Sequence, residues 1–229
     1  MLEHKGIEYK RVDLLPVASR LLVRLLGFPG NRVPALKIDG RRVQGTRETS
    51  RELDRVQPEP ALFPADPEKR RAVEEAEAWG DPFQQLPRTI IWWAIKRDPS
   101  SQLGFLEDAK LGLPPNLLVK TSAPVIWAAR RLNDSYDATV ERNLAELPLA
   151  LDQIDTWIAD GILGGTDLNA ADFQIAPSVR LLMAFADIRP AIEARPAGAF
   201  AKRVVPKAPG EIRPVFPEAW LAPLRAEVV

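Results

Sequence analysis

The sequence predicts a small α/β domain followed by a larger all-α domain. Two extended runs flank the dipeptide Asp39-Gly40, a combination typical of a β-hairpin. Four prolines then fall within residues 57–68, where they favour a stiff, extended connector. Beyond them, apolar residues recur at helical spacing, most clearly over 137–159. We therefore place the first domain at 1–56, the linker at 57–68, and an all-helical domain with a C-terminal extension at 69–229.

Composition limits the classes of function. The chain has 31 Lys and Arg and 31 Asp and Glu, so charge gives no reason to expect nucleic acid or an anionic membrane as a partner. The absence of cysteine excludes disulfides, a thiolate nucleophile and Cys-rich metal sites, and it argues against a redox protein. The single histidine, His4, cannot form a His-based triad or a multi-histidine metal site. The lack of cysteine indicates a cytoplasmic protein, and the balanced charge favours a small or neutral partner. No apolar stretch reaches the roughly 20 residues that span a bilayer.

A strand and a helix open the predicted first domain. Residues 7–14 alternate well enough to favour a strand. Residues 17–27 place four leucines on one helical face and close with Gly27, a typical C-terminal stop.

A hairpin and a second helix complete this domain. Residues 33–39 favour a strand although Pro34 lies inside it, which raises the question of what replaces the ladder hydrogen bond that a proline cannot donate. Asp39-Gly40 suits a two-residue turn, because both central positions of that turn need positive φ. The chain then returns through 41–45, and a helix begins at Thr46, whose hydroxyl suits an N-cap.

The second domain has two well-marked helices. Residues 137–159 form an amphipathic helix with apolar residues three and four apart. Asn169 and Asp172 have the spacing of a capping box, and we interpret them as a structural cap at the start of a helix over 168–185. The proline-rich tail wraps the surface, anchored by Phe216 and Trp220.

This order of elements resembles the glutathione transferase superfamily over nearly the whole chain. The most specific stretches are "VPALKIDGRRVQGT" and "GGTDLNAADFQIA", which resemble the Val-Pro strand with its hairpin and the buried capping box of that family. The resemblance implies a thioredoxin-like N-terminal domain, incomplete at its start, followed by the helical C-terminal domain of the family. It also implies a homodimer that conjugates glutathione to a small hydrophobic electrophile.

The same resemblance implies where glutathione binds. It implies a cis bond before Pro34, which leaves the backbone of Val33 free to hold the cysteinyl part of the ligand. Thr46 stands where the family has a serine that binds the γ-glutamyl carboxylate, at a helix N-terminus whose free N–H groups favour anions. Arg47 is placed to approach the same carboxylate. Gly45, however, offers no side chain to pair with the ammonium group of the ligand.

Five aromatic residues are candidates for the remaining roles. Phe83, Trp92 and Trp93 lie on helices that face the electrophile pocket in the family, although aromatic residues at helical spacing more often pack in a core. Tyr9 and Tyr136 are the only phenols, and we interpret both as packing residues.

No catalytic residue is assigned and no metal is expected. In the family, a first strand and the start of a first helix precede the segment that residues 1–14 resemble, and the thiol-activating Tyr, Ser or Cys follows that strand. The strand would lie between 7–14 and 33–39, so its absence leaves unpaired backbone groups on both. We expect either a start codon assigned too late or a sheet that is split, rearranged or completed by another segment. The functional alternative is a non-catalytic binding or interaction protein that has lost the thiol chemistry.

Overall fold

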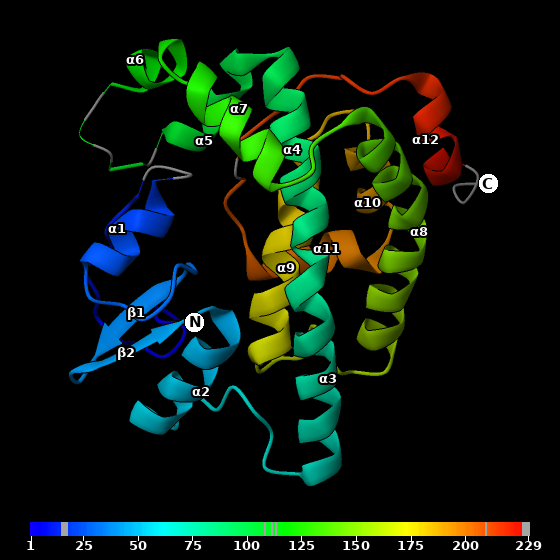
Figure 1. Ribbon diagram of the computed structural model, residues 1–229. Coiled ribbons are helices and arrows are strands. Elements are labelled where there is room, and N and C mark those ends of the chain that lie inside the picture. The colour runs from blue at the N-terminus through cyan, green and yellow to red at the C-terminus, as the bar shows by residue number, and fades with distance from the viewer. Residues whose placement is uncertain (15–17, 108, 111, 113, 209, 226–229) are drawn as a thin grey trace.

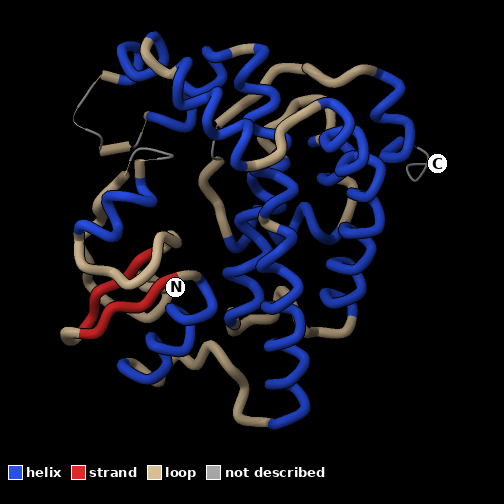
Figure 2. The backbone as a smooth tube through the Cα atoms, viewed as in Figure 1, coloured by secondary structure: helices blue, strands red, loops and turns tan. Residues whose placement is uncertain are grey.

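The protein is mostly helical and carries one small antiparallel sheet of two strands among the residues that the structure describes (Figures 1 and 2). The computed structural model describes residues 1–14, 18–107, 109–110, 112, 114–208 and 210–225. The N-terminal unit, with the sheet and the first two helices, lies beside a larger helical region (Figure 1). This agrees with a mixed α/β part followed by a helical part.

The predicted strand at 7–14 is wrong. These residues run as a loop (Figure 2), and their only backbone–backbone hydrogen bond to another described residue joins the Ile7 N–H to the Leu2 carbonyl. A strand needs a neighbouring strand to pair with, and the nearest one, β1, is separated from this loop by a cavity. The alternation of side chains is therefore not sufficient to make a strand here.

The first helix forms where it was predicted, but its leucines face solvent. α1 spans Ser19–Leu25, and Gly27 follows it with φ 82°, as a C-terminal stop requires. Leu21 and Leu25 are 64% and 72% exposed, and Val23 is the buried residue of the helix. The apolar face of α1 is therefore uncovered in this chain.

The hairpin prediction is confirmed. β1 (Ala35–Ile38) pairs with β2 (Arg41–Gln44), and Ile38 lies opposite Arg41 across the two-residue turn. Asp39 and Gly40 have φ of 47° and 80°, the positive values that this turn requires.

The second helix, α2 (Thr46–Val56), begins one position earlier than a cap at Thr46 predicts. Its N-cap is Gly45, not Thr46, and no side chain caps it. Gly45 has φ 88°, a conformation that a glycine adopts without strain, so the turn from β2 into the helix falls there. Thr46 thus becomes the first helical residue.

The helical region is built around three long helices. These are α3 (Pro67–Phe83), α8 (Asp137–Ala159) and α9 (Ala170–Leu182). α9 packs against α3 on one side and against α11 (Pro196–Val204) on the other, and α8 packs against α12 (Glu218–Arg225). The remaining elements are α4 (Gln85–Arg97), η1 (Pro99–Ser101), α5 (Gln102–Leu106), α6 (Pro115–Lys120), α7 (Ala123–Leu132) and α10 (Arg189–Glu193).

The core lies within this helical region and matches the predicted pattern. The inward face of α8 is fully buried through Val140, Leu144, Leu147, Leu151 and Ile154. The tail is anchored as expected, because Phe216 stacks on Trp93 at 5.4 Å between ring centroids. Burial of such aromatic rings is worth roughly 2–3 kcal/mol each, which stabilises the contact of the tail with the core.

Candidate functional site

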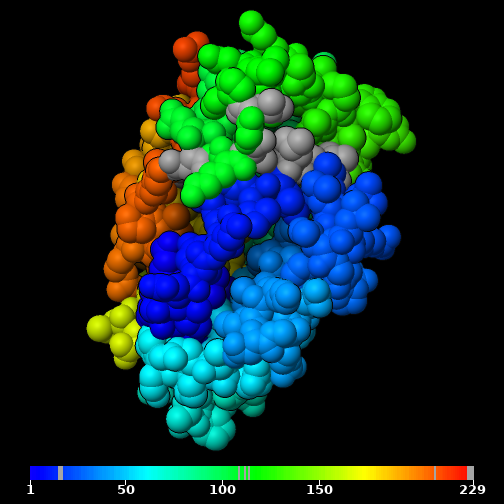
Figure 3. All heavy atoms as spheres, turned by 90° about the vertical axis from the view of Figure 1, so that its left-hand side faces the viewer, coloured from blue at the N-terminus to red at the C-terminus, as the bar shows by residue number. Residues whose placement is uncertain are grey.

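A cavity of about 1050 Å³ lies between the N-terminal loop and β1. Residues 7–14 form one wall, and α1 together with residues 33–38 forms the other. Phe105 and Leu106 of α5 close the side next to the helical region. Figure 3 shows the face on which it opens, between the dark-blue N-terminal loop and the lighter blue of α1 and the hairpin.

The start of β1 and the start of α2 are joined by one backbone hydrogen bond. The Gly45 N–H donates to the Pro34 carbonyl at 2.8 Å. Val33, which precedes Pro34 through a cis bond as the resemblance implies, lines the cavity and is 48% exposed. Its backbone makes no hydrogen bond to any other described residue. The structure therefore brings Val33 and Pro34 beside the N-terminus of α2.

The side chain of Gln44 fixes the loop that leads to Val33. Its Oε1 accepts from the Gly30 N–H at 2.6 Å, and its Nε2 donates to the Arg32 carbonyl at 3.0 Å. A Cβ on residue 30 would lie 2.9 Å from that Oε1, so a larger residue there would displace the end of the Gln44 side chain. The backbone of Val33 is thus presented by a loop that is held at both ends.

The N-terminus of α2 has free donors. The N–H groups of Thr46 and Arg47 belong to the first turn, which has no intrahelical acceptors, and they bond to no described residue. The carbonyl of Gly45 is used twice, by the N–H of Thr49 at 3.1 Å and by its hydroxyl at 2.8 Å. This end of the helix therefore offers N–H groups and positive potential to an anion.

Arg47 is engaged elsewhere. Its Nε lies 3.5 Å from a carboxylate oxygen of the fully buried Glu77 on α3, so the guanidinium lies at the contact between α2 and α3. The predicted approach of Arg47 to a ligand carboxylate therefore stays a prediction without support from this geometry.

The three predicted pocket aromatics do not line the cavity. Phe83 stacks on Trp79 at 4.8 Å between ring centroids, and Trp93 is buried with its Nε1 donating to Asp137 at 2.7 Å. Trp92 is half-buried against the same core. The surroundings of these three aromatic residues fit packing in the core better than they fit a ligand pocket. Their role in a pocket stays a prediction.

Two residues that sequence reasoning missed do line the cavity. Ser19 lies at the start of α1, and the only local signal for it is a hydroxyl residue directly before an apolar helical run. Phe105 comes from the short helix α5, and no periodic pattern marks it. Its position depends on how the helical region meets the N-terminal unit, which local sequence does not encode.

The two hydroxyl groups that line the cavity differ in their environment. The Tyr9 hydroxyl donates to a carboxylate oxygen of Glu3 at 2.9 Å, and this bond to an acidic residue raises the pKa of Tyr9. A phenol that already donates to a carboxylate is poorly placed to donate to a neighbouring thiolate as well. Ser19 makes no hydrogen bond to a described residue, so its hydroxyl is free to meet a ligand.

The capping box of α9 is confirmed and belongs to the fold. Asn169 Oδ1 accepts from the N–H groups of Ala171 and Asp172, and Asp172 Oδ2 accepts from the Asn169 N–H at 2.8 Å. The second oxygen of Asp172 accepts from the Gly164 N–H at 2.7 Å. Burial raises the pKa of Asp172, while these N–H bonds oppose the rise. Both residues lie outside the cavity, as their predicted structural role requires.

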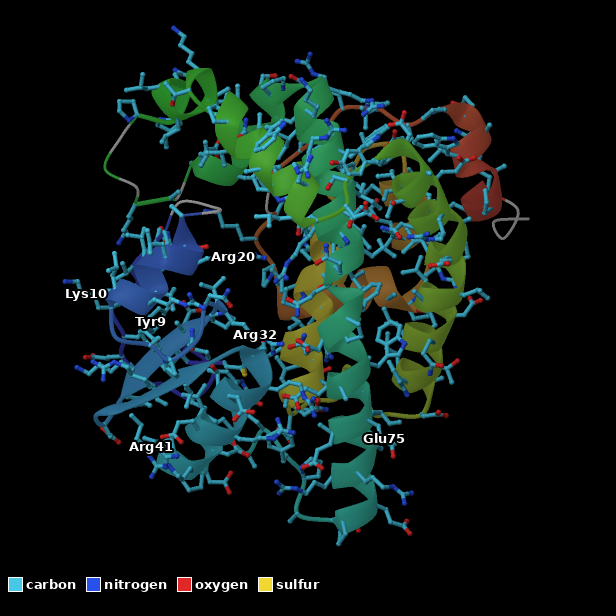
Figure 4. The ribbon with its side chains drawn as sticks, in the orientation of Figure 1. Tyr9, Lys10, Arg20, Arg32, Arg41 and Glu75 are labelled. Carbon is cyan, nitrogen blue, oxygen red and sulfur yellow. The ribbon has the colours of Figure 1, made fainter. Side chains whose placement is uncertain are left out.

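The N-terminal unit is basic although the whole chain is neutral. Residues 1–56 contain twelve Lys and Arg and seven Asp and Glu, against 31 of each in the full sequence. Lys10 and Lys37 line the cavity and form no ion pair with a described residue, and Figure 4 shows Lys10, Arg20 and Arg32 around this unit. The surroundings of the cavity therefore favour an anionic ligand.

Three further observations complete the description. No group of three side chains suited to hold a metal ion occurs among the described residues. Within the same part of the chain, no helix is both long enough and apolar enough to cross a membrane. Comparison with family models, curated proteins and solved structures finds no match to this chain.

Proposed function

We propose that the protein is glutathione transferase-like, with a thioredoxin-like N-terminal unit that binds glutathione where β1 meets α2. The observation that carries this proposal is the bond between Gly45 and Pro34, which sets the free backbone of Val33 beside the free N–H groups of α2. An extended peptide such as glutathione can pair its amides with the Val33 backbone. Its carboxylate would then accept hydrogen bonds from the first turn of α2 and from the hydroxyl of Thr46.

The proposed reaction is conjugation to a small hydrophobic electrophile. The glutathione thiol loses its proton to solvent, the thiolate attacks an electrophilic carbon, a C–S bond forms, and a leaving group such as halide departs with its electron pair. Donors near the sulfur would lower the pKa of the thiol and raise the fraction of thiolate. The free hydroxyl of Ser19 is the candidate donor that the cavity offers. The homodimer and the cytoplasmic location belong to the same proposal.

A second candidate is a binding protein without thiol chemistry. The Tyr9 hydroxyl favours it, because this phenol already donates its hydrogen bond to Glu3 and is not free to donate to a thiolate. The lack of a side chain at Gly45 favours it as well, since nothing there pairs with an ammonium group. This alternative predicts no conjugation.

The test is a calorimetric titration with glutathione, made on the wild-type chain and on Thr46→Val. This substitution keeps the shape of the side chain and removes its hydroxyl, so we expect affinity to fall about tenfold, or about 1.4 kcal/mol. Thr166→Val is the matched control, because Thr166 is exposed and lies far along the chain near α9. A folded wild-type chain that binds no glutathione, or equal losses in both variants, would refute the proposed site.

A conjugation assay then separates the two candidates. With glutathione and a chloronitrobenzene electrophile, turnover by the wild type that Ser19→Ala lowers at least tenfold supports the transferase. Binding without turnover above the uncatalysed rate supports the binding protein.

A further inference from the structure

Four helices toward the end of the molecule opposite the connector contain no acidic residue (Figure 1). α7 packs against α4, and α5 packs against α6 and, through η1, adjoins α4. These helices carry six basic residues: Arg88, Lys96 and Arg97 of α4, Lys120 of α6, and Arg130 and Arg131 of α7. The balanced charge of the whole chain therefore hides a local separation of charge, which gives a reason to consider an anionic surface as a partner.

Most of these basic residues have no acidic partner. Arg97 pairs with Asp137 at 2.9 Å, and the other five form no ion pair with the described part of the chain. Acidic residues border the four helices in sequence at Asp98, Glu107 and Asp134. The basic side chains between these borders are available to an anion, and at physiological ionic strength they act on it over about 8 Å.

Trp127 lies on the outer face of α7. It is 66% exposed, although tryptophan side chains are on average highly buried. Pro124 and Arg131, three residues before it and four after it, are exposed on the same face, because residues at these spacings are neighbours on a helix. Ile126 and Ala129 are buried, and α7 packs through its other side against α4. The indole ring therefore contributes little to the packing of the helix.

Cations lie on both sides of this ring along the chain. The Arg131 guanidinium lies over the indole of Trp127, 5.6 Å from the ring centroid, a contact that holds the cation beside the ring. Lys120 is exposed at the end of α6, and Leu117 on the same helix is 45% exposed. An exposed tryptophan among basic and apolar side chains is typical of helices that lie at the interface between membrane and water.

We propose that α6 and α7 dock on a membrane surface that contains anionic phospholipids. Trp127 enters the headgroup layer, and Lys120 and Arg131 bind anionic headgroups on either side of it. α7 has ten residues, a length of about 15 Å, which is half of the hydrocarbon thickness of a bilayer. The helix therefore lies along the surface and does not cross the membrane.

The arrangement favours a lipid surface over a nucleic acid. A single-stranded nucleic acid is bound by several aromatic rings that stack on successive bases and by a basic groove that follows its backbone. Trp127 is the only exposed aromatic residue that the described chain places on these four helices. A headgroup layer, in contrast, meets the ring and both cations at once, because it offers anionic and apolar groups in one plane.

This surface is separate from the glutathione site. The proposed glutathione site uses Val33, Thr46 and Ser19, and the cavity is not lined by α6 or α7. Either proposal can therefore fail alone.

The experiment is co-sedimentation of the full chain with sucrose-loaded vesicles. We expect binding to vesicles of phosphatidylcholine with about 30% phosphatidylserine, no binding to phosphatidylcholine alone, and weaker binding as salt is raised. Trp127→Ala should lower the partition coefficient at least about tenfold and Arg131→Gln about fivefold. The matched controls, Leu149→Ala on α8 and Arg71→Gln on α3, remove an exposed apolar and an exposed basic side chain elsewhere and should change it little.

A second measurement follows the ring itself. Brominated phosphatidylcholine in the mixed vesicles should quench the tryptophan fluorescence of the wild type more than that of Trp127→Phe. Circular dichroism checks that each variant is folded.

Three results would overturn the proposal: no binding of the wild type to the mixed vesicles, equal binding of Trp127→Ala and Leu149→Ala, or equal quenching of the wild type and Trp127→Phe. A dimer in sedimentation equilibrium that Trp127→Ala dissociates would assign this face of α7 to a second copy and would overturn it as well.

Discussion

Asp137 illustrates how one residue joins two helices. As the first residue of α8, it accepts from Trp93 Nε1 at 2.7 Å and from Arg97 at 2.9 Å, both on α4. The hydrogen bond from Trp93 and then that from Arg97 hold the pKa of Asp137 below its ordinary value of 3.8. Because the folded pKa is lowered, the stability from ionised Asp137 is present above about pH 4 and is lost as the pH falls through the lowered value.

We expect the indole N–H signal of Trp93 in a ¹⁵N–¹H spectrum to titrate with a midpoint below 3.8. The signal reports on Asp137 directly, because the two atoms share a hydrogen bond. It is assigned with Trp93→Phe, and Asp137→Asn serves as the control in which the titration disappears. A midpoint at or above 3.8 in the wild type would show that the pKa is not lowered.

At the residue scale, the sequence predicted what depends on near neighbours. Asn169 and Asp172 are three positions apart, and their bonds close within one helical turn, so spacing alone identified the cap. Arg47 and Trp93 were assigned to ligands, yet their partners are Glu77 and Asp137, which lie 30 and 44 positions away. Such partners are chosen by tertiary packing, and no local pattern encodes them.

At the element scale, the hairpin could be predicted and the strand at 7–14 could not. The hairpin needs only a turn of two residues with positive φ, which Asp39-Gly40 supplies. A strand at 7–14 needs a neighbour along its length, and the chain places a cavity there. The two-stranded sheet is therefore the part of the predicted sheet that local chemistry can build.

The contact between α2 and α3 depends on one buried carboxylate. Glu77 is fully buried and accepts from the Ser50 hydroxyl and from Arg51, each at 2.7 Å. Arg51→Met would leave this carboxylate without its nearest cation while keeping the apolar stem of the side chain. Since the Arg51 side chain is 35% exposed, we discount the 3–5 kcal/mol typical of buried pairs and expect a loss of about 1–3 kcal/mol.

Chemical denaturation followed by tryptophan fluorescence measures this loss. The matched control is Arg71→Met on α3, the helix that carries Glu77. Its pair with Glu75 is exposed on both sides and is worth at most about 0.5 kcal/mol. If the two variants lose the same stability, burial of Glu77 does not strengthen its ion pair. Glu77→Gln should fall between them, because it keeps a partner for Ser50 and removes the buried charge.

At the scale of the whole molecule, the order of the parts along the chain could be predicted from the sequence, but the contact between them could not. Proline clustering marked the connector, and α3 begins at Pro67 with Asp66 as its cap, close to the predicted boundary. The division into domains stays a prediction. The contact between the N-terminal unit and the helical region depends on Phe105, which lines the cavity, and on Lys5. The sequence analysis gave neither residue a role. Both make contacts across long stretches of chain, and such contacts leave no periodic signal.

Lys5 joins the N-terminal residues to the connector. Its side chain is buried, its Nζ donates to the carbonyls of Gln57 at 2.6 Å and Pro60 at 2.7 Å, and it lies 2.7 Å from Asp54. Asp54 in turn accepts from the N–H groups of Leu62 and Phe63, where the helical core begins. One ammonium group thus links the end of α2, the connector and the core.

Lys5→Met should therefore loosen the N-terminal unit more than the helical core. It leaves two carbonyls without a donor and Asp54 without its cation, a loss of about 2 kcal/mol or more. Hydrogen–deuterium exchange by mass spectrometry should show amides of α2 exchanging about thirtyfold faster, while amides in the middle of α8 change little.

Lys10→Met is the control, since Lys10 is exposed in the same N-terminal segment and forms no ion pair with the described chain. Equal acceleration in α2 and α8 would mean that the two parts unfold as one unit, because local opening of α2 would then require opening of the core. No acceleration in α2 would mean that Lys5 does not hold the connector, whatever its hydrogen bonds.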